Sequence, residues 1–274
     1  MEKKIFLMLI AAVVLLTACK DNTSSEVDYN PNVLSSKDYI RGEDAIFEVV
    51  NAFFKGVYDS LVTTEGYNYI DNCDVTYRVA ENALSFGYGT ENRGCEDNKL
   101  RRGNYLATFS GEIFEQGITA HIVTDSLFVD DLLVEMVLDI ENLGINTDNK
   151  PEFSMRVDSS NIMLPDSTKI NGVRISTDFM LVWEQGSSTP TIHEDDMFLV
   201  SGNASGTSTD GYAFNVSLTQ PSVNWLDCYW MYEEVSQITV PVAEIQSGEI
   251  VKDDTCHNEF FFYFDESMFF DQIK

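Results

Sequence analysis

The chain has 274 residues, of which 45 are Asp or Glu and 17 are Lys or Arg, so its formal net charge is −28 at pH 7. A field of this sign repels nucleic acid and anionic membrane surfaces, and neither is expected as a partner. Hydrophobic residues make up 44% and aromatic residues 12% of the chain, enough for the core of one large β domain or two small ones.

The first eighteen residues have the three zones of a secretory signal. A charged start precedes an apolar run from Ile5 to Leu16, and two small residues then precede Cys19. The run is shorter than the roughly twenty residues that a membrane-spanning helix needs. We therefore expect residues 1–18 to be a cleaved signal peptide. Loss of its two lysines and one glutamate leaves 256 residues with a net charge of −29.

The four residues from Leu16 to Cys19 resemble the lipobox of bacterial lipoproteins, in which the cysteine thiol is acylated and becomes the mature N terminus. This resemblance predicts that the Cys19 thiol is modified with fatty acyl chains such as palmitate. These chains would anchor the protein to a membrane. Residues 20–26 are polar and without periodicity, as expected of a flexible tether that spans residues 19–34. Lys20 and Asp21 resemble the surface-export signal of Bacteroides-type lipoproteins, which implies the cell-surface side of the outer membrane and an extracytoplasmic ectodomain.

Five cysteines are an awkward number for an exported protein. Assigning Cys19 to the lipid leaves Cys73, Cys95, Cys228 and Cys256. These four can form two disulfides in any of three pairings. Their order along the chain favours Cys73 with Cys95 and Cys228 with Cys256.

Hydrophobic periodicity predicts one helix followed by strands. Apolar residues recur at three- and four-residue intervals from about residue 43 to 62, which indicates an amphipathic helix. Later runs alternate with a period of two, at residues 105–109, 134–140, 153–157, 173–183, 212–218 and 260–264. We expect a mainly β ectodomain over residues 35–274, made of antiparallel, sandwich-like sheets. A weak internal similarity between residues 114–129 and 183–200 suggests two related β blocks that divide near residues 150–165.

One stretch resembles a family of Bacteroidota lipoproteins with a β-rich ectodomain. It comprises Leu84-Ser85-Phe86-Gly87-Tyr88-Gly89, then Cys95, then the run from Arg101 to Gly111. The likeness continues through residues 142–146 and 228–258. The segment Lys252 to Asn258 departs from the family's glycine-rich approach to Cys-Asp-Asn, so the C-terminal turn is expected to differ. The resemblance implies a fold type and a location, and no activity.

Motifs for catalysis or metal binding are absent from the sequence: it has no serine elbow, zinc-protease motif, phosphate loop or EF-hand loop. His193 and the three acidic residues after it could offer metal ligands, but consecutive side chains diverge, so we interpret them as a solvated loop. His257 adjoins Cys256, yet a disulfide would silence a Cys/His nucleophile pair. We predict no catalytic residue, no metal site and no cofactor.

Two further groups of side chains are candidate sites. The aromatic residues Trp225, Tyr229 and Trp230 have the flat faces that a sugar-binding platform needs, although packing beside Cys228 is the favoured interpretation. Three serines, each after an aspartate, resemble the acceptor sequence for O-glycosylation in Bacteroides, namely Ser60, Ser126 and Ser167.

These features predict a non-catalytic lipoprotein with a binding or structural role in the cell envelope, whose partner is a glycan or a protein. One alternative is an envelope polysaccharide hydrolase with carboxylates that no motif reveals. Another is an accessory or subunit of a surface fibre, which would have an unpaired edge strand. A cleft with converging carboxylates would favour the hydrolase. An exposed aromatic strip would favour the binding protein, and an open sheet edge would favour the fibre subunit.

Overall fold

The computed structural model describes residues 30–58, 67–70, 73–80, 82–95, 99–112, 115–163 and 172–273, with only the backbone described between 67 and 80. Its single long helix is α2, Pro31–Tyr58. The strands are β1 Tyr67–Ile70, β2 Cys73–Ala80, β3 Ala83–Gly94, β4 Leu100–Phe109, β5 Thr119–Val129, β6 Leu132–Ile145, β7 Pro151–Met163, β8 Arg174–Gln185, β9 Met197–Thr207, β10 Ala213–Leu218, β11 Ser222–Trp225, β12 Val235–Thr239, β13 Ser247–Val251, β14 Glu259–Phe264 and β15 Ser267–Gln272. A short 3₁₀ turn covers His193–Asp195. None of the described helices is long and apolar enough to cross a membrane.

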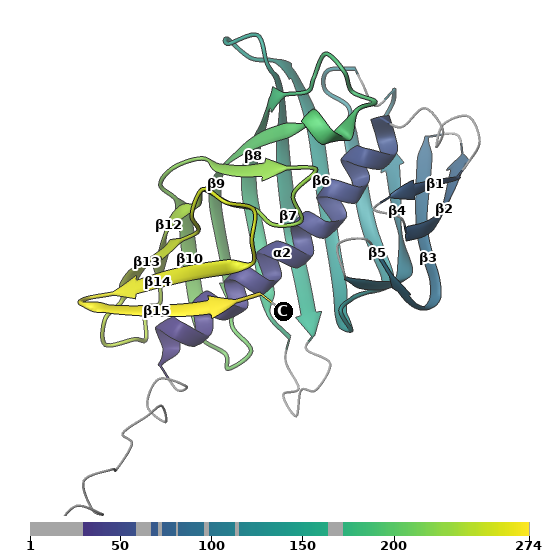
Figure 1. The fold of residues 1–274 in the computed structure, drawn as a ribbon. Coiled ribbons are helices and arrows are strands. Elements are labelled where there is room, and N and C mark those ends of the chain that lie inside the picture. The colour runs from purple at the N-terminus through teal and green to yellow at the C-terminus, as the bar shows by residue number, and fades with distance from the viewer. Residues whose placement is uncertain are drawn as a thin grey trace, which may run out of the picture. The chain divides into compact units, whose positions relative to one another are not determined.

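The strands form one antiparallel sheet, as Figure 1 shows. Consecutive strands pair from β1 to β10, and the order then continues through β12, β13, β14 and β15, while β11 pairs with β9. β1 and β15 are the two edges and do not pair with each other, so the sheet is open within the described residues. Each alternating run predicted from the sequence falls on a strand, which confirms the mainly β class.

The arrangement differs from the sandwich that the alternation suggested. The described residues contain no second sheet packed face to face against the first. They also show no division near residues 150–165, because β7 pairs with β6 on one side and with β8 on the other. Alternation reports that one face of a strand is buried, but it does not report what covers that face. Here the covering element is α2.

The helix is longer than predicted, since it begins at Pro31 rather than near residue 43. Residues 31–34, expected in the tether, are therefore helical, and the predicted end at residues 59–62 lies outside the described residues. Asn30 followed by Pro31 is a favoured helix start, because proline suits the first helical position. Buried polar residues such as Ser36 and Asp38 interrupt the apolar periodicity of the first turns and hide the helix from the sequence pattern.

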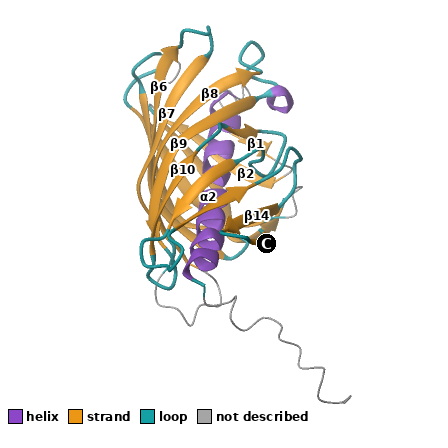
Figure 2. Cartoon of the chain, turned by 90° about the vertical axis from the view of Figure 1, so that its left-hand side faces the viewer, coloured by secondary structure: helices purple, strands orange, loops and turns teal. Residues whose placement is uncertain are grey.

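The core lies between α2 and the concave face of the sheet, which curves around the helix in Figure 2. Every residue of α2 is buried or partly buried. Aromatic pairs join the helix to successive strands: Tyr39 with Phe214 at 6.2 Å, Phe47 with Phe179 at 6.4 Å and Phe54 with Phe198 at 4.7 Å between ring centroids. Gly42 allows a close approach of helix and sheet, because a Cβ there would overlap the side chain of Ile175.

Candidate functional site

The cysteines expected to pair do so where the structure describes them. Cys228 and Cys256 form a disulfide with Cα atoms 5.8 Å apart, which confirms that pairing. Cys95 is also disulfide-bonded, but the side chain of Cys73 lies outside the described residues, so the identity of its partner stays a prediction. Cys19 lies outside them too, and its lipidation stays a prediction.

The three aromatic residues proposed as a platform have different surroundings. Trp225 is 36% exposed, and its Nε1 donates a hydrogen bond to the carbonyl of Glu194 at 2.9 Å. Trp230 packs against the core, with the Lys99 ammonium 4.0 Å from its ring centroid. Tyr229 lines a hollow of about 20 Å³. The geometry gives Trp230 a packing role, and a shared sugar platform stays a prediction.

Of the three serines predicted as glycan acceptors, only Ser126 lies within the described residues. It is exposed, with a left-handed φ of 52°, at the point where the β5–β6 register shifts. Its hydroxyl donates to Asp125 at 3.2 Å. Ser60 and Ser167 lie outside the described residues, so their modification, like that of Ser126, stays a prediction.

The histidines make local contacts. His193 Nδ1 lies 3.2 Å from a carboxylate oxygen of Asp196, and His257 Nε2 lies 2.9 Å from Asp253. Among the described residues, no group of three or more His, Cys, Asp or Glu side chains is arranged to hold a metal ion. Cys256 is in the disulfide, so it has no thiol with which His257 could act as a nucleophile pair.

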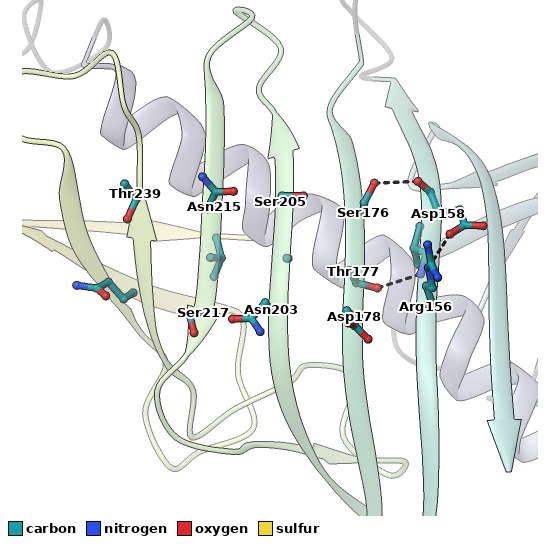
Figure 3. Close-up of a pocket in the computed structure, with 14 residues that line it drawn as sticks. Arg156, Asp158, Ser176, Thr177, Asp178, Asn203, Ser205, Asn215, Ser217 and Thr239 are labelled. Atoms are coloured by element: carbon teal, nitrogen blue, oxygen red, sulfur yellow. Dashed lines mark hydrogen bonds and ion pairs between the residues drawn. The ribbon is translucent and has the colours of Figure 1, made fainter. Parts of the chain in front are cut away.

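A shallow polar depression of about 670 Å³ lies on the face of the sheet opposite α2, across β7, β8, β9, β10 and β12 (Figure 3). Short polar side chains line it, including Ser176, Asn203, Ser205, Asn215 and Ser217. Its Asp158 is solvated and ion-paired with Arg156 at 2.7 Å, and its Asp178 is exposed. A glycosidase acid needs a sheltered carboxyl group whose pKa is raised. Both carboxyl groups of the depression are exposed, so it is poorly suited to hydrolysis.

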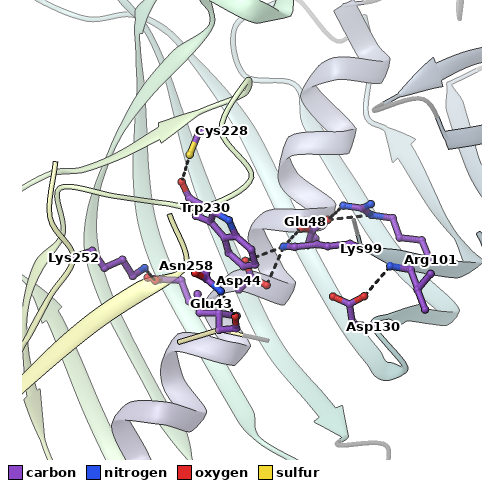
Figure 4. A network of polar contacts seen from close by, with 12 residues as sticks. Glu43, Asp44, Glu48, Lys99, Arg101, Asp130, Cys228, Trp230, Lys252 and Asn258 are labelled. Atoms are coloured by element: carbon purple, nitrogen blue, oxygen red, sulfur yellow. Dashed lines mark hydrogen bonds and ion pairs between the residues drawn. The ribbon is translucent and has the colours of Figure 1, made fainter. Parts of the chain in front are cut away.

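Two buried ionic clusters join α2 to the sheet. In the first, Lys252 lies 2.6 Å from carboxylate oxygens of both Glu43 and Glu234, as Figure 4 shows for Glu43. The hydroxyl of Tyr39 donates to Glu43 at 2.5 Å, and that of Ser236 donates to Glu234 at 2.7 Å. Two carboxylates share one ammonium, so the cluster would carry a net negative charge if all three groups were ionised.

That unbalanced charge changes the titration of the cluster. Burial raises the pKa of Glu43 to about 7, with the charge of Glu234 adding to the rise and Lys252 opposing it. Burial alone would lower the pKa of Lys252, but the two carboxylates raise it above its ordinary value. The first cluster therefore tends to bind one proton near neutral pH.

The second cluster is balanced in charge. Lys99 lies 3.2 Å from Asp44 and also forms an ion pair with Glu48. Arg101 forms a second ion pair with Glu48 (Figure 4). Burial raises the pKa of Asp44 to about 6, against the opposing charge of Lys99. Burial would raise the pKa of Glu48 as well, but Arg101 and Lys99 lower it to about 2.

Neither cluster offers a substrate space. Glu43 is 2% exposed and Lys252 is 6% exposed, so the first is sealed from solvent. The second adjoins the 20 Å³ hollow, which is lined by Glu48 and Arg101 and is about the size of one water molecule. Perturbed pKa values also arise in structural ion pairs. We interpret both clusters as structural ion pairs that hold the helix against the sheet.

The C-terminal hairpin presents an apolar surface that the sequence analysis did not single out. Phe260, Phe262 and Phe264 of β14 point inward and are buried. Phe261 and Tyr263 alternate with them and point outward, as do their cross-strand partners Phe270 and Met268. We call these last four side chains the hairpin patch.

The hairpin patch is contiguous and accessible. The rings of Phe261 and Phe270 lie 5.3 Å apart. Tyr263 is 38%, Met268 60% and Phe270 49% exposed. The hairpin ends in β15, which has only β14 as a neighbouring strand among the described residues. Clustered exposed apolar side chains beside an open edge are typical of an interaction surface.

The sequence contains a signal for the hairpin patch. The run Phe260 to Phe264 is aromatic at every position, so it lacks the polar alternation of a strand with one solvated face. Such a run predicts apolar side chains on both faces.

No protein-family model, curated protein sequence or solved structure matches this chain.

Proposed function

We propose that the chain is a lipid-anchored protein of the cell envelope, placed on the outer surface of the outer membrane, whose body binds an extended segment of a partner protein and performs no catalysis. The signal sequence and the lipobox-like segment ending at Cys19 support the anchor. The Cys228–Cys256 disulfide is consistent with an oxidising compartment outside the cytoplasm. The resemblance to Bacteroidota lipoproteins agrees with this placement.

The observation that carries the binding function is the combination of the hairpin patch and the open edge at β15. A strand added beside β15 would form main-chain hydrogen bonds along that edge. Its outward side chains would alternate, and every second one would meet Met268 or Phe270. Main-chain pairing would supply affinity, and the apolar contacts would set the register.

Charge narrows the class of partner. Acidic residues lie around the hairpin patch, at Glu249 on β13, Glu259 on β14, and Asp265 and Glu266 in the turn. The only Lys or Arg from residue 247 to 273 is Lys252, which is buried in the first cluster. The fitting partner segment alternates apolar residues and has Lys or Arg at its ends.

The binding test is selection of short random peptides displayed on phage by the chain without its signal peptide and lipid. The expected sequences alternate apolar residues between basic ends. The double variant Met268→Glu/Phe270→Glu should lose them, whereas Leu106→Glu should keep them because Leu106 is 43% exposed on the distant strand β4. Peptides that bind both variants equally would contradict the proposed surface.

The anchor has its own test. The parent chain should incorporate a palmitate analogue and sediment with membranes, while Cys19→Ser should do neither. An unlabelled parent chain would contradict the anchor without affecting the binding result.

A subunit of a surface fibre is the second candidate, because the same open edge could accept a donated strand from another subunit. Filaments that form from the purified protein and disappear with Met268→Glu/Phe270→Glu would favour it. A sugar would be the partner instead if no peptide were selected and a glycan array gave ligands for the parent chain. Those ligands should then fail to bind the Met268→Glu/Phe270→Glu variant.

A further inference from the structure

The turn between β12 and β13, residues 241–246, holds two aliphatic side chains in solvent. Val242 is 66% exposed and Ile245 is 40% exposed. The turn is closed by a hydrogen bond from the backbone N–H of Val240 to the carbonyl of Gln246 at 2.7 Å. The turn is therefore closed by its own backbone, and both side chains remain exposed within the described residues.

This turn lies at the start of α2. The side-chain amide of Asn32 donates to the carbonyl of Ile245 at 2.7 Å, which joins the turn to the first residues of the helix (Figure 1). The chain reaches α2 from Cys19 through residues 20–30. Eleven residues span at most about 40 Å. An anchor at Cys19 therefore keeps this end of the body near the membrane.

Other turns differ in chemistry or in position. The β9–β10 turn is fastened to the same end of the helix, because Thr209 donates to Asp38 at 2.7 Å, but its residues 208–211 are polar or glycine. The β6–β7 turn carries Ile145, which is 63% exposed. It lies toward the other end of the helix, where Phe153 near the start of β7 meets Phe54.

We propose that Val242 and Ile245 enter the interface of the membrane that carries the Cys19 lipid, so that the body docks on the bilayer through this turn. The inference rests on the anchor in the proposed function. The acyl chains hold the turn at high local concentration near lipid, so two aliphatic side chains suffice to set the orientation. The net charge of −29 after removal of the signal peptide and Glu244 within the turn favour a zwitterionic lipid surface over an anionic one.

The test uses the full lipidated chain in phosphatidylcholine vesicles, some made with brominated acyl chains that quench tryptophan at the depth of the interface. Val242→Trp places a probe in the turn. Ile145→Trp is the matched control, with a native side chain of nearly equal exposure at the other end. The parent's three tryptophans give a common background that is subtracted.

We expect the added fluorescence of Val242→Trp to be quenched by brominated lipid and that of Ile145→Trp to be unchanged. With Cys19→Ser introduced, both the co-sedimentation and the quenching should be lost. If the chain co-sediments and Val242→Trp is quenched no more than Ile145→Trp, the docked turn is wrong and the anchor stands. If the parent chain does not co-sediment, both are wrong.

Discussion

The two parts of the sheet are stabilised in different ways. From β3 to β9 the strands are 10 to 14 residues long, and they cover α2 with aliphatic and aromatic side chains. From β10 to β15 the strands have 4 to 6 residues. Short ladders make few hydrogen bonds and bury little surface, so the second part needs other connections.

Those connections are polar or covalent, and many lead to the helix. Lys252 reaches Glu43, Lys37 of α2 pairs with Asp271 at 3.0 Å, and Asn224 donates to Asn51 at 2.8 Å. The disulfide adds a cross-link within the short-strand part. The short strands therefore depend on a few specific residues, whereas the long strands combine distributed packing with one ionic cluster, at Arg101 of β4.

The largest effect is expected for Lys252→Met. The change leaves Glu43 and Glu234 buried without their cation, so the free energy of unfolding should fall by about 3–5 kcal/mol. Lys37→Met is the control, because the Lys37 and Asp271 side chains are 29% and 25% exposed, and its loss should be about 1 kcal/mol or less. Urea unfolding measures both. Equal losses would mean that the buried cluster does not fasten the short strands.

Removing the disulfide is next. Cys228→Ser/Cys256→Ser opens a loop with a sequence separation of 28, and chain entropy predicts a loss of about 3–4 kcal/mol. Limited proteolysis should then cut first within residues 227–257. Initial cleavage within β4 to β8 would contradict the division between the two parts.

In the long-strand part, a single backbone position should matter at the β4–β5 bulge. Gly103 has φ of +90°, and a Cβ there would overlap the carbonyl of Ser126. Gly103→Ala should cost about 2–4 kcal/mol from strain and collision. Gly211→Ala is the control, because Gly211 has a similar φ of +87° but open space around it. Its loss of stability should be smaller than that of Gly103→Ala, and the difference is the cost of the collision. Thermal unfolding of both variants gives the difference.

The smallest effect is a gain that depends on pH. The pKa of Glu43 is raised to about 7 in the fold from an ordinary value of 4.5, so its stabilising proton is present at low pH and lost as pH rises from about 4.5 to 7. Glu43→Gln introduces a neutral amide, whose oxygen can accept from Lys252 and whose NH₂ group can donate to Tyr39. The variant should be more stable than the parent by about 1–3 kcal/mol at pH 8 and nearly equal at pH 4.5.

Urea unfolding gives the free energy of unfolding of the variant and the parent at both pH values. The difference between the two proteins at each pH isolates the contribution of Glu43 from that of other titrating groups. A variant less stable than the parent at pH 8 would show that Glu43 is ionised and strongly paired there.

Sequence patterns predicted the strands well where one face is buried and the other solvated. Residues 134–140 and 153–157 alternate clearly, and they lie in β6 and β7. The pairing of Cys228 with Cys256 followed from order along the chain. These are local signals, so a single sequence contains them.

What the sequence did not reveal depends on distant residues. The start of α2 contains several polar residues, and buried Asp38 accepts a hydrogen bond from Thr209, 171 positions away. Lys252 and Glu43 meet across 209 positions. Alternation could not show that the helix, rather than a second sheet, covers the concave face. The alternation of Phe260, Phe262 and Phe264 predicts only the buried face, and the hairpin patch on the other face depends also on the pairing of β14 with β15.

The burial of α2 has a mechanical consequence. The chain enters the fold through Pro31, so tension on the proposed Cys19 anchor would pull first on the helix. The helix is fastened along its length, by Asp38 to Thr209, by Glu43 to Lys252 and by Glu48 to Arg101. A pulling force is therefore shared across the sheet and does not peel one strand from its edge.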